Sequence, residues 1–171
     1  CDSVEAFVAW QTAVEHKSTP TALILTRQNL AHNARDAAQV AAIRKGGYVL
    51  KDCVGTPKAV IIATGSEVAL ATAAQQTLAD KGVPVRVVSM PSNFVFEQQD
   101  AAYRDSVLPR GIPRVAVEAG STTGWYRYVG LEGAVVGIDR FGECGPAAQV
   151  FEYLGITAAK VTEAVEKVIA G

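Results

Sequence analysis

The sequence has 171 residues, a net charge of −1 from 16 Lys and Arg against 17 Asp and Glu, and 49% hydrophobic residues. This length corresponds to one domain, with or without an appendage, and the apolar content excludes an intrinsically disordered chain. The near-neutral charge provides no electrostatic basis for binding nucleic acid or an anionic membrane, and no apolar run approaches the roughly 20 residues of a membrane-spanning helix.

The start of the chain and its cysteines bear on its origin. The sequence begins at Cys1 without a methionine, which predicts a fragment of a longer protein, and its acidic beginning does not resemble a secretory signal peptide. The three cysteines are far apart and form no C-x-x-C motif, so neither a zinc ribbon nor a thioredoxin-like site is supported. Without an N-x-[ST] acceptor, this pattern favours a reducing, cytoplasmic environment. Cys144 is expected to be a small buried filler rather than a reactive thiol.

The first 45 residues predict a helix, a strand and a linker. Residues 2–16 combine an N-cap aspartate and a capping-box glutamate with apolar residues at helical spacing. Residues 21–26 form a short apolar run typical of a strand buried on both faces, with Arg27 just past its carboxyl end. Residues 31–45 are polar and alanine-rich, which predicts a partly helical linker. A domain boundary is expected near residue 46.

The remaining sequence alternates between strand and helix patterns. Strands are expected at 48–53, 59–63, 83–90, 114–118 and 134–138, and helices at 64–81, 97–107, 146–154 and along the apolar stripe of 161–169. Such alternation predicts a three-layer α/β/α sandwich, with a mixed, mostly parallel five-stranded sheet. The first strand should pair with the second through a short turn and should be the antiparallel one.

Two groups of candidate site residues favour structural roles. Thr64-Gly65-Ser66-Glu67 lies at a strand-to-helix turn that can bind an anion. Glu67 already places negative charge at that helix end, and no dinucleotide or P-loop motif is present, so a capped helix is the favoured interpretation. His16 and His32 have no sequence neighbours that would complete a catalytic dyad or a metal site. Surface positions are expected for both, although a site role stays open for His32 because it is close to Arg27.

Three further candidates lie in the second half of the chain. Glu118 ends a strand where ligands of parallel sheets bind, and a functional role stays as open as capping a helix or pairing with a base. The aromatic cluster of residues 125–128 favours packing in the core or at a subunit interface over base stacking. Residues 141–146 predict a turn that opens a helix.

Arg27 is the strongest candidate for a binding residue. A guanidinium at the carboxyl end of a strand can reach into a cleft, and its planar fork suits phosphate or carboxylate oxygens. The residues alone leave the alternative open, and slightly favoured, that Arg27 forms a salt bridge at a domain border.

Seven segments, in order along essentially the whole chain, resemble the C-terminal part of transketolases. They are PTALILTRQNLA, RKGGYVLKDC, IIATGSEVALA, VRVVSMPS, DAAYRDSVLP, RVAVEAG and FGECGPAAQVFEYLG. The runs TRQNL and GGYVLK are specific to this family, whereas GSEV is shared among related thiamine diphosphate enzymes. The family often has Ser-Ala where Cys144-Gly145 stands here, a small-for-small change that affects no assigned role.

The resemblance implies a division of the chain and an activity for its parent. Residues 1–30 would be the tail end of a pyrimidine-binding domain, 31–45 a linker and 46–171 the transketolase C-terminal domain. The parent would be a homodimer that uses thiamine diphosphate and a divalent metal, Mg or Ca. It would move a two-carbon ketol unit from a ketose phosphate to an aldose phosphate. Arg27 matches the family's arginine that contacts the substrate phosphate, so this role overtakes the salt bridge.

The resemblance implies no catalytic, cofactor-binding or metal-binding residue in this chain. The family's metal and diphosphate motif and its substrate-binding histidines belong upstream. The fragment alone is therefore expected to bind no cofactor, to be inactive and to serve assembly and stability. The alternatives are a regulatory or nucleotide-binding α/β module, or the C-terminal domain of dihydroxyacetone synthase or deoxyxylulose phosphate synthase.

Overall fold

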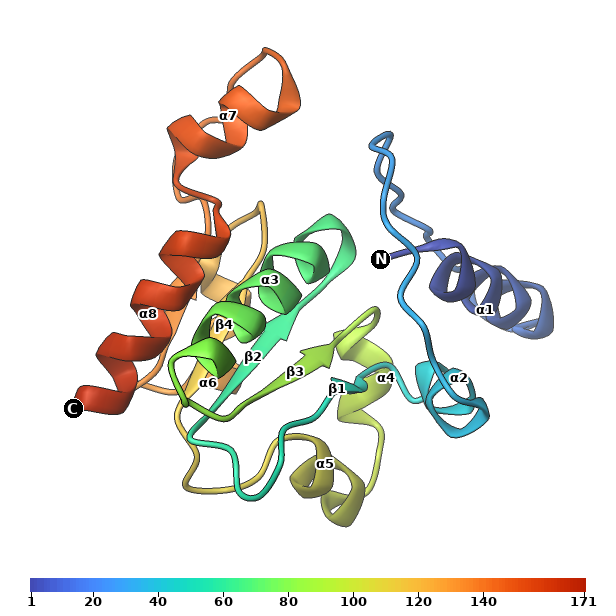
Figure 1. Cartoon of the computed structure of the whole chain (residues 1–171). Coiled ribbons are helices and arrows are strands. Elements are labelled where there is room, and N and C mark those ends of the chain that lie inside the picture. Colours follow the sequence, from blue (N-terminus) through green and yellow to red (C-terminus); the bar gives the residue numbers. More distant parts are fainter.

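The computed structural model describes residues 1–171 and has one five-stranded sheet with helices on both faces (Figure 1). The strands are β1 (Tyr48–Lys51), β2 (Ala59–Ala63), β3 (Val85–Ser89), β4 (Arg114–Val117) and β5 (Ala134–Val136). The α-helices are α1 (Ser3–Glu15), α2 (Ala37–Ile43), α3 (Val68–Asp80), α4 (Asn93–Glu97), α5 (Ala101–Val107), α6 (Tyr126–Val129), α7 (Ala147–Leu154) and α8 (Ala158–Ala170). Two short 3-10 helices are η1 (Gly65–Glu67) and η2 (Thr122–Trp125).

The sheet has the strand order β1-β3-β2-β4-β5, with β1 antiparallel to β3 and all other pairs parallel. The three-layer mixed sheet is therefore confirmed, and so is the antiparallel first strand. Its expected partner was wrong, because β1 pairs with β3 and not with β2. The parallel partners β3 and β4 occupy both edges of β2, so the outer edge of β3 is the edge left for β1.

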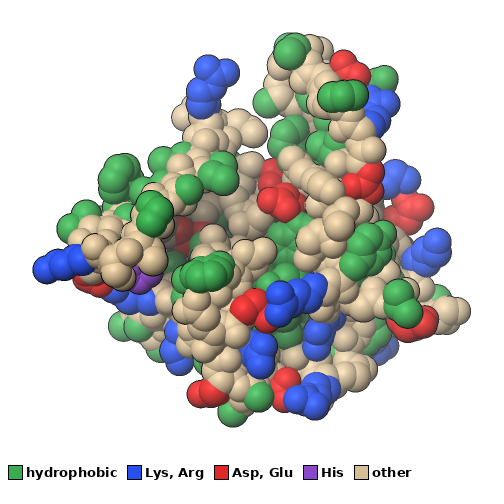
Figure 2. All heavy atoms as spheres, turned by 180° about the vertical axis from the view of Figure 1, so that it is seen from behind, with side chains coloured by type: hydrophobic (Ala, Val, Ile, Leu, Met, Phe, Trp, Pro, Cys, Tyr) green, Lys and Arg blue, Asp and Glu red, His purple; other side chains and the backbone are tan.

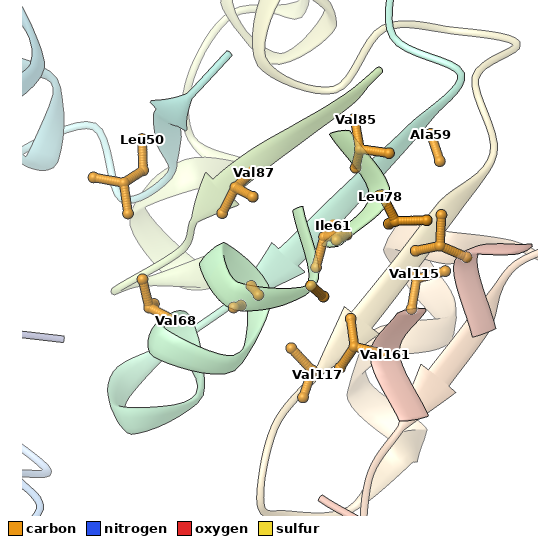
Figure 3. Packing of buried hydrophobic residues seen from close by; sticks show 14 of the residues in the cluster. Leu50, Ala59, Ile61, Val68, Leu78, Val85, Val87, Val115, Val117 and Val161 are labelled. Atoms are coloured by element: carbon orange, nitrogen blue, oxygen red, sulfur yellow. The ribbon is translucent and has the colours of Figure 1, made fainter. Parts of the chain in front are cut away.

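Each parallel strand is apolar on both of its faces because both faces are covered by helices. Val87, Ile61 and Val115 lie in register across β3, β2 and β4 and belong to the core beneath α3 and α8. Figure 3 shows this core, to which α3 contributes Leu78 and α8 contributes Val161. The alternate residues of the same strands form the second core, against α4, α5 and α6. Full burial of one such aliphatic side chain contributes about 1.5–3 kcal/mol.

Of the helix expected over 97–107, only residues 101–107 form one, α5, and a separate short helix, α4, ends at Glu97. The Ser92 hydroxyl accepts a hydrogen bond from the Val95 N–H and starts α4, and the Asp100 carboxylate accepts one from the Tyr103 N–H at 2.7 Å and starts α5. Two N-caps eight residues apart define two short helices rather than one, because each cap satisfies the free N–H groups of its own first turn.

The N-terminal part departs from expectation at one element. The predicted helix is confirmed as α1, and the helical part of the linker is α2, which begins with a capping box between Asp36 and Gln39. Residues 21–26 do not form a strand, and the side chain of Ile24 is 97% exposed. The expected strand was therefore wrong for this chain. A strand needs a hydrogen-bonded neighbour, and no strand of this sheet lies beside this segment.

Candidate functional site

The candidate residues lie on the side of the sheet where the parallel strands end. On this side the loop of residues 17–35 and the arm that carries α7 project beyond the body of the molecule (Figure 1). Seen from behind, the surface is hollowed between these two projections (Figure 2). The carboxyl ends of parallel strands are the usual place for ligands in such folds. This edge is therefore where site residues should be sought.

Arg27 is exposed near the tip of the first projection and takes part in no ion pair or hydrogen bond of the structure. Within this chain, Arg27 therefore forms no salt bridge. Its loop has little internal support, since no backbone group of residues 17–32 makes a backbone–backbone hydrogen bond. Inside it, the Gln28 N–H donates to the Thr26 hydroxyl at 3.2 Å. Within this chain, the contacts that hold the loop are therefore at its two ends.

The end of the loop nearer to Arg27 is held by a cluster of polar side chains, which we call the buried ionic cluster. Its members are Asp2, Glu5, Arg35, Tyr48 and Ser89. The side chain of Arg35 is 1% exposed and donates from Nη1 to Asp2 Oδ2 at 2.7 Å and from Nε to the Tyr48 hydroxyl at 2.7 Å. The cluster therefore joins the linker to α1 and to the sheet.

Glu5 is the shared acceptor of the buried ionic cluster. Its Oε1 accepts from the Tyr48 hydroxyl at 2.7 Å and from the Ser89 hydroxyl at 2.6 Å, and Arg35 Nη2 lies 3.6 Å away. The other carboxylate oxygen contacts the α-amino group of Cys1. Because a buried carboxylate is costly without partners, these contacts are what allow Glu5 to lie inside the molecule.

Two members of the cluster have shifted pKa values. Burial opposes ionisation of Asp2, but hydrogen bonds from Arg35, Asn33 and the Glu5 N–H outweigh it and lower its pKa to about 2. Burial raises the pKa of Tyr48, and the negative charge of Glu5 raises it further. The phenol therefore stays protonated and keeps its donor role.

Sequence reasoning interpreted Asp2 and Glu5 only as helix-capping residues and missed the cluster. Asp2 does cap α1 through its Oδ1, but its Oδ2 binds Arg35 and the Asn33 N–H. Glu5 and Ser89 are separated by 84 positions, so no local pattern could have paired them. Arg35 gave no distinct signal either, because the linker of residues 31–45 also contains Arg44 and Lys45.

The turn at residues 64–67 has no side-chain cap. Ser66 donates its hydroxyl to Glu67 Oε1 at 2.6 Å, and Glu67 is buried. No side chain caps the start of η1 or α3, so the expected capping role of Glu67 is limited to its charge at this helix end. His16 and His32 are both exposed, which confirms the surface positions expected for them.

Glu118 has a partner that neither interpretation considered. Its Oε2 accepts a hydrogen bond from the indole Nε1 of Trp125 at 2.5 Å, so it neither caps a helix nor pairs with a base. Trp125 and Tyr128 are buried in the second core, which confirms the packing role for half of the aromatic cluster. Tyr126 and Arg127 of the same cluster face solvent.

The arm beyond β5 is almost entirely exposed. Residues 141–146 precede α7 as irregular chain with a bend at Gly145 and not as the expected turn, and no residue of α7 is buried. Cys144 is an exposed free thiol, so the expectation of a buried filler was wrong. The reason is that Cys144 lies in the exposed segment of residues 139–149, whereas the contacts of this arm with the first core come from Phe151 and Leu154 further along α7.

No three side chains of His, Cys, Asp or Glu are grouped closely enough to hold a metal ion. No helix of the structure has both the length and the apolar character needed to cross a membrane.

The family is decided by a match over most of the chain. Residues 46–157 match the model of the transketolase-like TK C-terminal domain. The chain belongs to the transketolase family, as its C-terminal region. This transketolase region is 57% identical to Transketolase 1 of Escherichia coli over 162 residues, which is 94% of this chain and 24% of that protein.

Solved transketolases have the same fold. The transketolase from Leishmania mexicana superposes with a TM-score of 0.91 at 37% identity, covering 99% of this chain and 24% of that one. A transketolase from Pichia stipitis in complex with sedoheptulose 7-phosphate superposes with a TM-score of 0.89 at 37% identity, again over 99% and 24%. This transketolase region thus spans about a quarter of the length of the relatives it matches.

Proposed function

We propose that this chain is part of a homodimeric, cytoplasmic transketolase that moves a two-carbon ketol unit from a ketose phosphate to an aldose phosphate. Thiamine diphosphate and a divalent metal, Mg or Ca, supply the carbon–carbon chemistry in that enzyme. Neither has a site among the residues of this chain, so its contribution is to bind and orient substrate and to support the fold. The Pichia stipitis relative in complex with a ketose phosphate supports sugar phosphates as the ligand class.

Arg27 is the residue of this chain that binds the substrate phosphate. The observation that carries this role is that its guanidinium is exposed and unpaired on a loop beside the hollowed edge of the sheet. A planar guanidinium can donate two parallel hydrogen bonds to phosphate oxygens, and a charge-assisted contact of this kind fixes the position of the sugar. Holding the far end of the sugar orients its reacting carbon and lowers the entropic part of the barrier.

The chain divides into three parts in this proposal. Residues 1–30 complete a pyrimidine-binding domain, 31–45 link it to the next domain, and 46–171 form the C-terminal domain. The exposed side chains of Ile24 and Leu25 support this division, because an apolar run with strand character has no neighbour in this chain. In the parent, residues 21–26 would pair with strands of the preceding domain.

The phosphate role is tested by Arg27→Ala in the intact enzyme. The KM for a ketose phosphate should rise roughly ten- to hundredfold, since each charge-assisted hydrogen bond contributes about 1.5–3 kcal/mol. The KM for an unphosphorylated ketose should not change. For the ketose phosphate, the KM of Arg27→Lys should lie between those of the unsubstituted enzyme and of Arg27→Ala. Arg110→Ala removes another exposed arginine, paired only with Asp105, and is the control. An unchanged preference for phosphorylated sugars in Arg27→Ala would remove the assignment.

The role of the isolated chain is tested separately. The 171-residue chain, supplied with thiamine diphosphate and magnesium, should not transfer a ketol unit, since a supporting role requires no catalysis. Measurable transfer from a ketose phosphate to an aldose phosphate would contradict the proposal that it serves assembly and stability.

A further inference from the structure

We propose that the boundary between the C-terminal domain and the domain that precedes it is a rigid joint, locked by Glu5 of α1. The inference rests on the division of the chain proposed above, in which α1 belongs to the preceding domain, and it is independent of the phosphate role of Arg27. It assigns a role to the buried ionic cluster, whose charged side chains lie where the two domains meet.

The C-terminal domain presents two hydroxyl groups to α1, which we call the hydroxyl pair. Tyr48 of β1 and Ser89 of β3 are opposite each other in the antiparallel register, so their side chains lie on the same face of the sheet. Both residues are buried. Their hydroxyls donate to the same atom, Glu5 Oε1, at 2.7 and 2.6 Å. The hydroxyl pair is therefore a fixed site for one carboxylate oxygen of α1.

A buried carboxylate makes the position of α1 specific. Glu5 is itself buried, and a carboxylate inside a protein is costly unless donors surround it. A rotation of α1 about its axis would turn Glu5 away from the hydroxyl pair and leave its charge unpaired. Apolar packing resists such a rotation less, because the burial of apolar area has no preferred direction. The orientation of α1 against the sheet is therefore set by Glu5.

Arg35 of the linker adds a second attachment at the same place. Its Nη1 donates to Asp2 Oδ2 and its Nε to the Tyr48 hydroxyl, both at 2.7 Å. Its Nη2 lies 3.6 Å from Glu5 Oε1. A buried ion pair is strongly destabilised when one partner is removed, because the other charge is then left uncompensated. The linker therefore cannot leave α1 without exposing both carboxylates.

The opposite face of α1 is left for the preceding domain. Phe7, Trp10 and Val14 lie on that face at helical spacing, and each is more than half exposed. Glu5 and Val8 are the buried residues of α1, and Val8 belongs to the first core together with residues of β1. One helix can therefore contact both domains at once, which a joint between them requires.

The contacts of Glu5 are compatible with a preceding domain. The partners of its Oε1 are Arg35, Tyr48 and Ser89, all of which lie within this chain. The solved transketolase from Leishmania mexicana superposes over nearly the whole of this chain, so α1 has the same place against the sheet in that protein. A preceding domain therefore adds contacts to α1 without replacing those of Glu5.

Hydrogen exchange of the 171-residue chain tests the joint, because exchange of the α1 amides reports how often α1 opens. Glu5→Gln keeps the shape of the side chain but replaces a charged acceptor by an amide. Exchange of the amides of residues 7–15 should become about ten- to hundredfold faster, the loss expected for one charge-assisted hydrogen bond. Glu15→Gln is the matched control on the same helix, since Glu15 pairs with Arg44 in solvent, and should change the rate about threefold at most.

Two results would overturn the joint. One is an equal effect of Glu5→Gln and Glu15→Gln on the α1 amides. The other is exchange of the α1 amides in the unsubstituted chain as fast as that of the loop of residues 17–32, which has no backbone–backbone hydrogen bond. Should Glu5→Gln not fold, Ser89→Ala, which removes one donor of the hydroxyl pair, is judged by the same criteria. The KM of Arg27→Ala tests the phosphate role in a separate experiment, so either proposal can fail alone.

Discussion

Two adjacent glycines set the close approach of the linker to α4. Gly46 has a φ of +83°, and a Cβ at this position would lie 2.3 Å from the Ser92 carbonyl oxygen. A Cβ on Gly47 would lie 2.8 Å from the ring of Phe96. The Gly-Gly pair that marked the domain boundary in the sequence is therefore required by packing, since no other residue tolerates both the conformation and the contact.

Replacing Gly46 by alanine should destabilise the protein by about 2–4 kcal/mol, from left-handed backbone strain and overlap with α4. Gly55→Ala is the control, because Gly55 has a φ of +77° but open space around its Cβ position, and should cost only about 1 kcal/mol. Urea unfolding of both variants measures the difference. Equal midpoints would show that the overlap is relieved without cost.

The lowered pKa of Asp2 predicts a loss of stability in acid. Its carboxylate is favoured in the folded state, so the stabilisation is fully present above the unfolded pKa near 3.8 and is lost as pH falls from about 4 to about 2. Asp2→Asn should therefore lower the free energy of unfolding by about 2 kcal/mol at pH 7 and by much less at pH 2. Chemical unfolding across this range, with the exposed Asp80→Asn as control, tests it. A constant difference between Asp2→Asn and the unsubstituted chain would contradict it.

At the scale of the element, the apolar stripe of α8 packs in the core. Its N-cap Thr157 accepts a hydrogen bond from the Lys160 N–H, and one face of the helix places Val161 and Val165 in the core without any exposure. The stripe predicted from spacing is therefore the face that covers α3 and the sheet.

Val165→Ala should destabilise the protein by about 2 kcal/mol, from lost burial and the cavity left behind. Glu166→Ala, one position further and exposed, removes only a surface pair with Lys81 and should cost no more than about 0.5 kcal/mol. Thermal unfolding of the two variants compares them. Similar costs would mean that α8 is not packed as the structure shows.

At the scale of the whole molecule, several exposed apolar side chains lie in the N-terminal part of the chain. Phe7, Trp10 and Val14 face solvent from one side of α1 and are 68%, 56% and 74% exposed. Ile24 and Leu25 on the neighbouring loop are exposed as well. Apolar groups gathered in this way mark a surface that is covered in a larger assembly, which agrees with the proposal that the parent has a preceding domain there.

The isolated chain should therefore self-associate, because this surface is left uncovered. In sedimentation, the average mass of the unsubstituted chain should rise with concentration. The double variant Trp10→Gln/Ile24→Lys should have a lower average mass than the unsubstituted chain at the same concentration. Leu131→Lys, at a single exposed position remote from α1, serves as control and should have no effect. A chain that stays monomeric without substitution would contradict the prediction.

Local pattern was sufficient wherever burial by an element's own neighbours decides its structure. The run Ala59–Ala63 is apolar throughout because strands and helices enclose it on all sides, and its strand was predicted correctly. The apolar stripe of α8 and the N-cap of α1 were also predicted correctly from local pattern. The start of α5 at Asp100 could have been predicted, since aspartate is a favoured N-cap residue.

Sequence by itself determined the α/β layers, the five strands, the family and Arg27 as the residue to examine, because periodicity and motifs are properties of consecutive residues. Only the tertiary structure decided that β1 pairs with β3, that residues 21–26 form no strand here, and that Glu5, Arg35 and Tyr48 meet. Strand pairing and buried charge both depend on partners distant in the chain. Their free energy is realised only when those partners are brought together, which no local pattern records.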